Sequence, residues 1–140
     1  MATPTQYRKR ITELGLDRLE FHVSTLDEAK SWLAKVRTLE TQLRQIKREI
    51  NMEISVIRDN YKTKAASAAS SGALLEVFGK RKAAGQLRAS RKRDLTSQRD
   101  REIAPYQQVK LTIDDLLTQT GSAKTQIQTW MTEAKTDQQS

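Results

Sequence analysis

The sequence predicts an all-α protein: a long antiparallel helical hairpin, similar to a coiled coil, with a short helix at each end of the chain. Three observations support this prediction. Only five glycines and two prolines occur in 140 residues, whereas residues that favour helix are plentiful. Apolar residues recur every three to four positions over long stretches. A segment of small residues separates two such stretches, so residues 1–140 are expected to form one helical domain that folds back on itself.

The N-terminal part, residues 1–25, is expected to contain a short helix followed by a connection. Thr3 directly before Pro4 is typical of a helix start, because proline is well tolerated in the first helical turn. Gly15 is a typical helix stop. Ile11 is then expected to face the interior of the domain.

The first long helix is predicted over residues 26–66. Thr25, followed three residues later by Glu28, has the spacing of a capping box. The apolar residues after it follow a heptad, with Ala29, Val36, Leu43, Ile50 and Ile57 at one core position and Trp32, Leu39 and Ile46 at the other. A single helix cannot bury its own apolar stripe, so this helix needs a partner.

A tip loop is predicted at residues 67–79, because the chain from Lys64 to Gly72 contains only small residues after the lysine and ends in a glycine. With the turn centred near residue 73, positions whose numbers sum to about 146 should face each other. This register places Leu43 near Ile103, and it matches apolar with apolar residues along the base of the hairpin.

The second long helix is predicted over residues 80–120. Pro105 removes one backbone hydrogen bond inside it, which predicts a kink near that residue. Gly121 is expected to end the helix, and Ser122 to cap a last helix over residues 122–136. The two terminal helices should brace the base of the hairpin.

Toward the tip, the expected register leaves several large aliphatic side chains without adequate apolar partners in the same chain. Exposed apolar stripes of this length are uncommon on monomers. A homodimer is therefore expected, with hairpins side by side and an interface formed by Ile50, Ile54, Ile57 and Tyr61.

The positive charge is concentrated in one segment. The net charge is +8, from 25 Lys and Arg against 17 Asp and Glu, yet no acidic residue occurs from Val77 to Arg93. This basic run contains seven cations: Lys80, Arg81, Lys82, Arg88, Arg91, Lys92 and Arg93. Such a stripe suits a phosphate backbone, and the lack of aromatic residues among the charges argues against base stacking. The sequence therefore predicts a polyanion site, with DNA or RNA as the first-ranked partner.

Two other functions fit the same segment. The chain could be a coiled-coil adaptor or scaffold whose basic run docks an acidic protein partner. Less favoured is contact with an anionic membrane surface, through the basic run and the apolar residues just before it: Leu74, Leu75, Val77 and Phe78.

No catalytic, metal-binding or cofactor-binding residues are predicted. The chain has no cysteine and one histidine, His22, with no nucleophile in a recognisable arrangement around it. Asp114 and Asp115 are adjacent on a helix, so their side chains point about 100° apart and cannot converge on one ion. The chain has neither an apolar run of ~20 residues nor a secretory signal, so a non-enzymatic cytoplasmic protein without a transmembrane segment is expected.

Residues 27–61, from Asp27-Glu-Ala-Lys-Ser-Trp to Ile57-Arg-Asp-Asn-Tyr61, resemble the long helix of phage Gam-type host-nuclease inhibitors. Members of that family are coiled-coil proteins that bind DNA ends. The basic run and Pro105 do not continue the match, so the resemblance does not assign the chain to that family.

Overall fold

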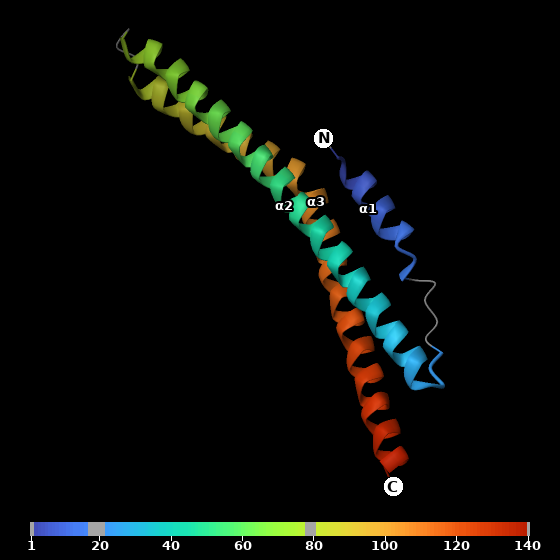
Figure 1. Cartoon of the computed structure of the whole chain (residues 1–140). Coiled ribbons are helices and arrows are strands. Elements are labelled where there is room, and N and C mark those ends of the chain that lie inside the picture. The colour runs from blue at the N-terminus through green and yellow to red at the C-terminus, as the bar shows by residue number, and fades with distance from the viewer. Residues whose placement is uncertain (1, 17–21, 78–80, 140) are drawn as a thin grey trace. The chain divides into compact units, whose positions relative to one another are not determined.

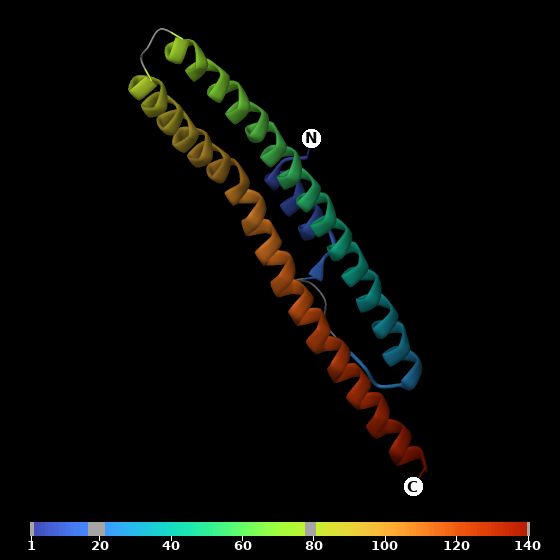
Figure 2. The same ribbon diagram turned by 90° about the vertical axis from the view of Figure 1, so that its left-hand side faces the viewer.

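The computed structural model describes the backbone of residues 2–16, 22–77 and 81–139, and the side chains of these except 68–77, 81–84, 88 and 137–139. Three helices occur in the described chain: α1 (Pro4–Glu13), α2 (Leu26–Val77) and α3 (Arg81–Gln139). None of the described residues forms a strand. The all-α prediction and the long antiparallel pair are confirmed, because α2 and α3 pack side by side in opposite directions (Figures 1 and 2).

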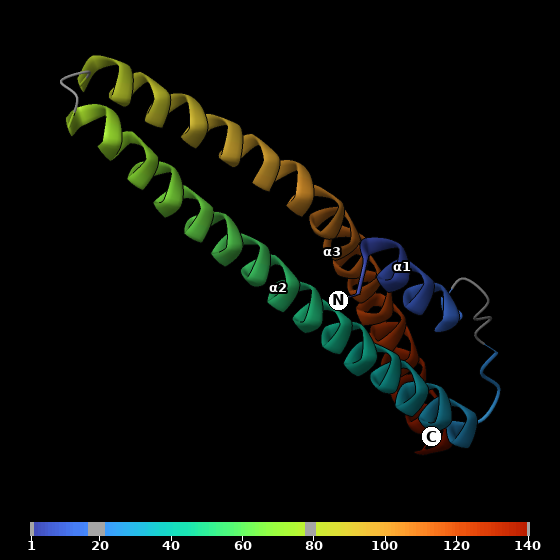
Figure 3. The same ribbon diagram turned by 90° about the horizontal axis from the view of Figure 1, so that it is seen from above.

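Helix α1 begins and ends as predicted. The Thr3 hydroxyl accepts a hydrogen bond from the Gln6 backbone N–H at 3.2 Å, and the Gln6 side chain accepts one from the Thr3 N–H at 2.8 Å. Gly15 has a φ of 70°, a conformation that favours glycine and ends the helix. Tyr7 and Ile11 are buried, and α1 lies along the helix pair (Figure 3), where Arg10 forms an ion pair with Glu49 at 2.7 Å.

Helix α2 is longer than predicted. Its start agrees with the expectation: the Thr25 hydroxyl accepts from the Glu28 N–H at 3.1 Å. The helix then continues to Val77, so the predicted tip loop at 67–79 is wrong over residues 67–77, and its last two residues, 78 and 79, lie outside the described residues. The segment that suggested a loop is rich in alanine, which has the highest helix propensity of all residues. A single glycine inside the helix, Gly72, lowers helix stability by only about 1 kcal/mol relative to alanine.

Helix α3 is also continuous where the sequence suggested two helices. It runs through Gly121, so the predicted end there and the separate helix at 122–136 are wrong. The buried positions Thr120 and Ile127 continue the apolar repeat across this glycine, and their packing outweighs its low helix propensity. The helix also passes without a break through Pro105, whose side chain is exposed.

The chain forms two compact units, each built from a segment of α2 and a segment of α3. Unit 1 comprises residues 1–50 and 109–140, and unit 2 comprises residues 51–108. The buried apolar residues of the long helices in unit 1 are Ala29, Leu33, Val36, Leu39, Leu43, Ile46, Ile50, Val109, Ile113 and Ile127. Those of unit 2 are Ile54, Ile57, Ile103 and Tyr106.

The register of the helix pair differs from the predicted one. In unit 1, Glu40 pairs with Lys124 at 2.8 Å and Lys47 with Asp114 at 2.5 Å, so facing numbers sum to 161–164. In unit 2, the Tyr61 hydroxyl donates to Glu102 at 2.7 Å, which gives 163. A sum near 160 also describes the packing of Leu33 with Ile127 in one apolar cluster. The predicted sum of about 146 is therefore wrong.

The heptad repeat explains why the predicted register of α2 against α3 is wrong. The observed sums of 160–164 exceed the predicted sum of about 146 by 14–18, which is about two heptads, and a heptad pattern matches apolar with apolar residues after any shift of seven residues. The apolar pattern alone therefore does not select between such registers, whereas the position of the turn does. Because α2 extends to Val77, the turn lies later than residue 73 and the partner positions shift along α3 by about 20 Å.

A buried charge cluster lies in unit 1. Glu40 is only 3% exposed, and its carboxylate contacts the Lys124 ammonium at 2.8 Å and the Arg44 guanidinium at 3.2 Å. Thr120, also buried, donates its hydroxyl hydrogen bond to the Leu117 carbonyl at 3.0 Å. A buried carboxylate needs its cations close by, so this cluster favours one alignment of α2 and α3 over its heptad-shifted alternatives.

Candidate functional site

The predicted cationic residues lie in unit 2. Arg91, Lys92 and Arg93 are exposed on α3, and no ion pair joins them to a carboxylate in the described part of the chain. The Arg93 Nε donates to the Ala89 carbonyl at 3.4 Å, within the same helix. Helix α3 also contains Arg81, Lys82 and Arg88, whose side chains the structure does not describe. Lys80 lies outside the described residues.

Unit 2 carries most of the net charge of the chain. It contains twelve Lys and Arg against six Asp and Glu, a net charge of +6, whereas unit 1 contains thirteen against eleven, a net charge of +2. The excess positive charge thus belongs to a helix pair in which both helices contribute cations.

The buried apolar residues of unit 2 do not extend into its cationic part. Among the described side chains from residue 58 to residue 102, none is buried. The helices meet there through half-buried side chains, with Tyr61 and Ala65 on α2 and Leu95 on α3. Small and polar residues leave space beside this seam, so the helix pair is grooved where it is most positively charged.

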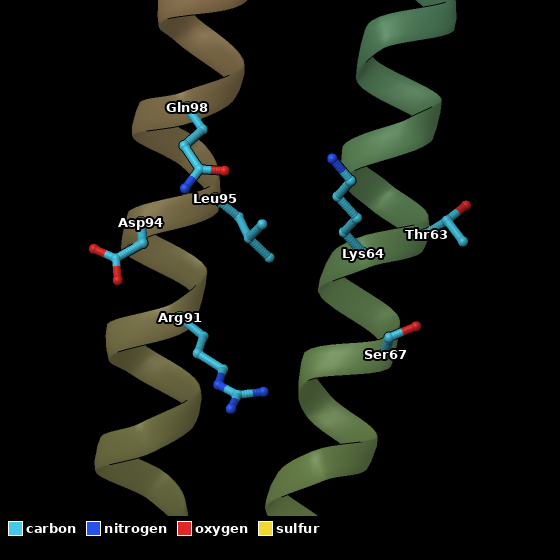
Figure 4. A pocket seen from close by; sticks show the side chains of 7 residues that line it. All are labelled: Thr63, Lys64, Ser67, Arg91, Asp94, Leu95 and Gln98. Carbon is cyan, nitrogen blue, oxygen red and sulfur yellow. The ribbon is translucent and has the colours of Figure 1, made fainter.

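Two grooves flank the seam, and Leu95 lines both. The first, which we name the Lys64 groove, has a volume of about 410 Å³ and is lined by Thr63, Lys64, Ser67, Arg91, Asp94, Leu95 and Gln98. Figure 4 shows Lys64, Arg91 and Leu95 directed into the space between α2 and α3, whereas Asp94 points away from it. The Lys64 ammonium lies 4.5 Å from the centre of the Tyr61 ring.

The second, which we name the Arg58 groove, has a volume of about 310 Å³ and is lined by Arg58, Asp59, Tyr61, Lys62, Ala65, Lys92, Leu95, Thr96 and Arg99. Four of its side chains are cationic, two from each helix, against one carboxylate. Arg58 and Arg99 also line an adjoining hollow that reaches Gln107. Arg99 forms an exposed ion pair with Asp100 at 3.2 Å, and such pairs contribute little.

The α2 cations of both grooves are functional candidates that the sequence reasoning missed. Arg58, Lys62 and Lys64 precede the basic run and are mixed with acidic residues along the chain. The observed register places them beside Arg91, Lys92 and Arg99, whereas the predicted sum of about 146 would place Arg58 opposite Arg88 and Lys64 opposite Lys82. The position of the turn therefore decides which α3 cations they join.

The premise of the predicted dimer interface is wrong. Ile50, Ile54 and Ile57 are 0%, 4% and 4% exposed within a single chain, so the apolar stripe does not need a second copy to cover it. Tyr61 is half-buried and its hydroxyl donates to Glu102 of the same chain. This hydrogen bond is the main reason why the pKa of Tyr61 lies above its ordinary value of 10.0, with further contributions from desolvation and from the negative charge of Glu102.

His22 and Asp114, which the sequence does not predict as catalytic or metal-binding residues, make contacts that stabilise the fold. The His22 carbonyl accepts a hydrogen bond from the Trp32 indole N–H at 3.2 Å, and Asp114 is paired with Lys47. No group of three or more His, Cys, Asp or Glu is arranged to hold a metal ion among the described residues. Within the same residues, no helix combines the length and the apolar character needed to cross a bilayer.

Comparison with known proteins adds no relationship: no family model matches the chain, and neither a curated protein nor a solved structure matches it.

Proposed function

We propose that this protein is a non-enzymatic nucleic-acid-binding protein, and that unit 2 contacts the phosphate backbone without sequence specificity. The observation that carries the proposal is the exposed group Arg91, Lys92 and Arg93, which has no ion-pair partner among the described residues and stands beside cations of α2. Cations that are not neutralised within the protein remain available to phosphates, and each phosphate they neutralise releases counterions.

The chemistry of the surface favours backbone contact over base recognition. The described grooves contain one aromatic residue, Tyr61, and its hydroxyl is already hydrogen-bonded to Glu102. Sequence-tolerant single-strand binding normally uses several aromatic side chains on which bases stack. A cytoplasmic location and the absence of enzymatic activity are parts of this proposal.

The test is binding to duplex DNA, single-stranded DNA and RNA as salt is raised, with anionic liposomes in parallel. We expect affinity for duplex to fall with salt, with a log–log slope of about 0.9 per contacted phosphate. Changing Arg88, Arg91, Lys92 and Arg93 together to Gln should flatten that slope and leave the helicity measured by circular dichroism unchanged, because the described members of this set are exposed.

The matched control removes four exposed cations from unit 1 by changing Arg8, Lys9, Lys30 and Arg37 to Gln. This variant has the same net charge as the unit 2 variant and should keep most of the wild-type affinity for duplex DNA. Full affinity in the unit 2 variant would remove the basic run from the proposal. If no nucleic acid binds near 50 mM salt, the proposal fails and an adaptor with an acidic protein partner becomes the better explanation. Binding only to liposomes would favour contact with an anionic membrane.

A further inference from the structure

We infer that the Arg58 groove, rather than the Lys64 groove or the basic run alone, is the place where the phosphate backbone binds, so that the ligand is held by α2 and α3 together. This inference rests on the proposed function, because it specifies where on unit 2 the nucleic acid lies.

Cationic side chains are more concentrated at the Arg58 groove than at the Lys64 groove. The Arg58 groove brings four cations around a volume of about 310 Å³, with one carboxylate, Asp59, among its lining residues, and one of these cations, Arg99, is also paired with Asp100. The Lys64 groove is larger, at about 410 Å³, and has only Lys64 and Arg91 as cations, with Asp94 among its lining residues. Coulombic attraction for an anion is therefore stronger at the Arg58 groove than at the Lys64 groove.

The charged surface at the Arg58 groove is elongated. Arg58 and Arg99 belong both to the Arg58 groove and to the adjoining hollow that reaches Gln107, so the two form one track along the seam of unit 2. Lys92 and Arg99, seven residues apart on α3, lie on the same helix face, as do Arg58 and Lys62, four residues apart on α2. A linear chain of phosphates can engage both rows, whereas a single small anion can engage only part of them.

Without a bound anion, the cations of the Arg58 groove repel one another across the two helices. Cations of α2 and α3 are grouped around a seam that has no buried side chain from residue 58 to residue 102 among those described, so like charges oppose close packing of the helices there. A bound polyanion removes this repulsion and bridges the two helices. Binding should therefore slow amide hydrogen exchange in residues 58–67 and 91–99 of wild-type protein.

The experiment compares two double variants that each remove one Lys from α2 and one Arg from α3. Lys62→Gln with Arg99→Gln alters the Arg58 groove, and Lys64→Gln with Arg91→Gln alters the Lys64 groove. With a 20-base-pair duplex near 50 mM salt, we expect the first pair to weaken binding about tenfold or more and to reduce the salt slope by about 1.8, and the second pair to weaken it less than about threefold. Circular dichroism and urea unfolding of both variants verify that the fold is retained.

The outcomes separate this inference from the proposed function. If the two pairs weaken binding equally, or the Lys64 pair weakens it more, the Arg58 groove is not the site, while nucleic-acid binding by unit 2 still stands. If the wild-type protein does not bind duplex at all, the proposed function fails and this inference fails with it.

Discussion

Replacing Ile54 with Asp is expected to lower the free energy of unfolding by about 4 kcal/mol or more, because it removes a well-packed aliphatic side chain and buries a carboxylate without a partner. Ile54 is 4% exposed and belongs to the small core of unit 2. The measurement is urea unfolding followed by circular dichroism at 222 nm.

The control is Met52→Asp, two residues earlier on the same helix, where the native side chain is 67% exposed. Both variants introduce the same residue into the helix interior, so they share the helix-propensity term, and Met52→Asp should change stability by less than about 1 kcal/mol. If Ile54→Asp instead stays as stable as the wild-type protein and light scattering shows that it has dissociated from a dimer into single chains, the stripe is an oligomer interface and its burial within one chain is wrong.

Replacing Lys124 with Met is expected to lower the free energy of unfolding by about 2 kcal/mol, because the buried Glu40 carboxylate loses its closer cation. The Glu40 side chain is 5% exposed, whereas its remaining partner, Arg44, is 58% exposed and compensates the charge less well. Changing Glu40 to Leu together with Lys124→Met removes the charge as well as its partner, and should restore stability to the wild-type level or above it.

The control for this pair is Lys47→Met, which breaks the ion pair with Asp114. That carboxylate is 47% exposed and stays hydrated, so the loss should be less than about 1 kcal/mol. Equal losses for Lys124→Met and Lys47→Met in urea unfolding would contradict the special role assigned to the Glu40 cluster.

The sequence predicted the fold class and most of the buried positions of α2. A heptad depends only on local spacing, and burial of Ala29, Val36, Leu43, Ile50 and Ile57 follows from it. Trp32 was placed at a core position but is half-buried, and the neighbouring Leu33 is buried instead. The helix starts at Thr3 and Thr25 were also predictable, because capping is a contact between residues three apart.

The register and the site could not be obtained in the same way. Shifts of seven residues leave the apolar pattern satisfied, so the pattern does not choose among registers, and helix ends set by Ala, Ser and a single Gly are weakly marked. The basic run on α3 is visible as a charge pattern. Which cations of α3 lie beside Arg58 and Lys62 depends on the part of α2 that faces this run. Only the observed register determines that part.

The claim proposed above, that cations of both helices of unit 2 contact the phosphate backbone, can be tested by lysine acetylation of the wild-type protein with and without bound duplex DNA, read by mass spectrometry. We expect bound DNA to protect Lys62 on α2 and Lys92 on α3, while Lys30, exposed in unit 1, reacts at an unchanged rate. Protection of Lys92 without Lys62, or equal protection of Lys30, would contradict the claim.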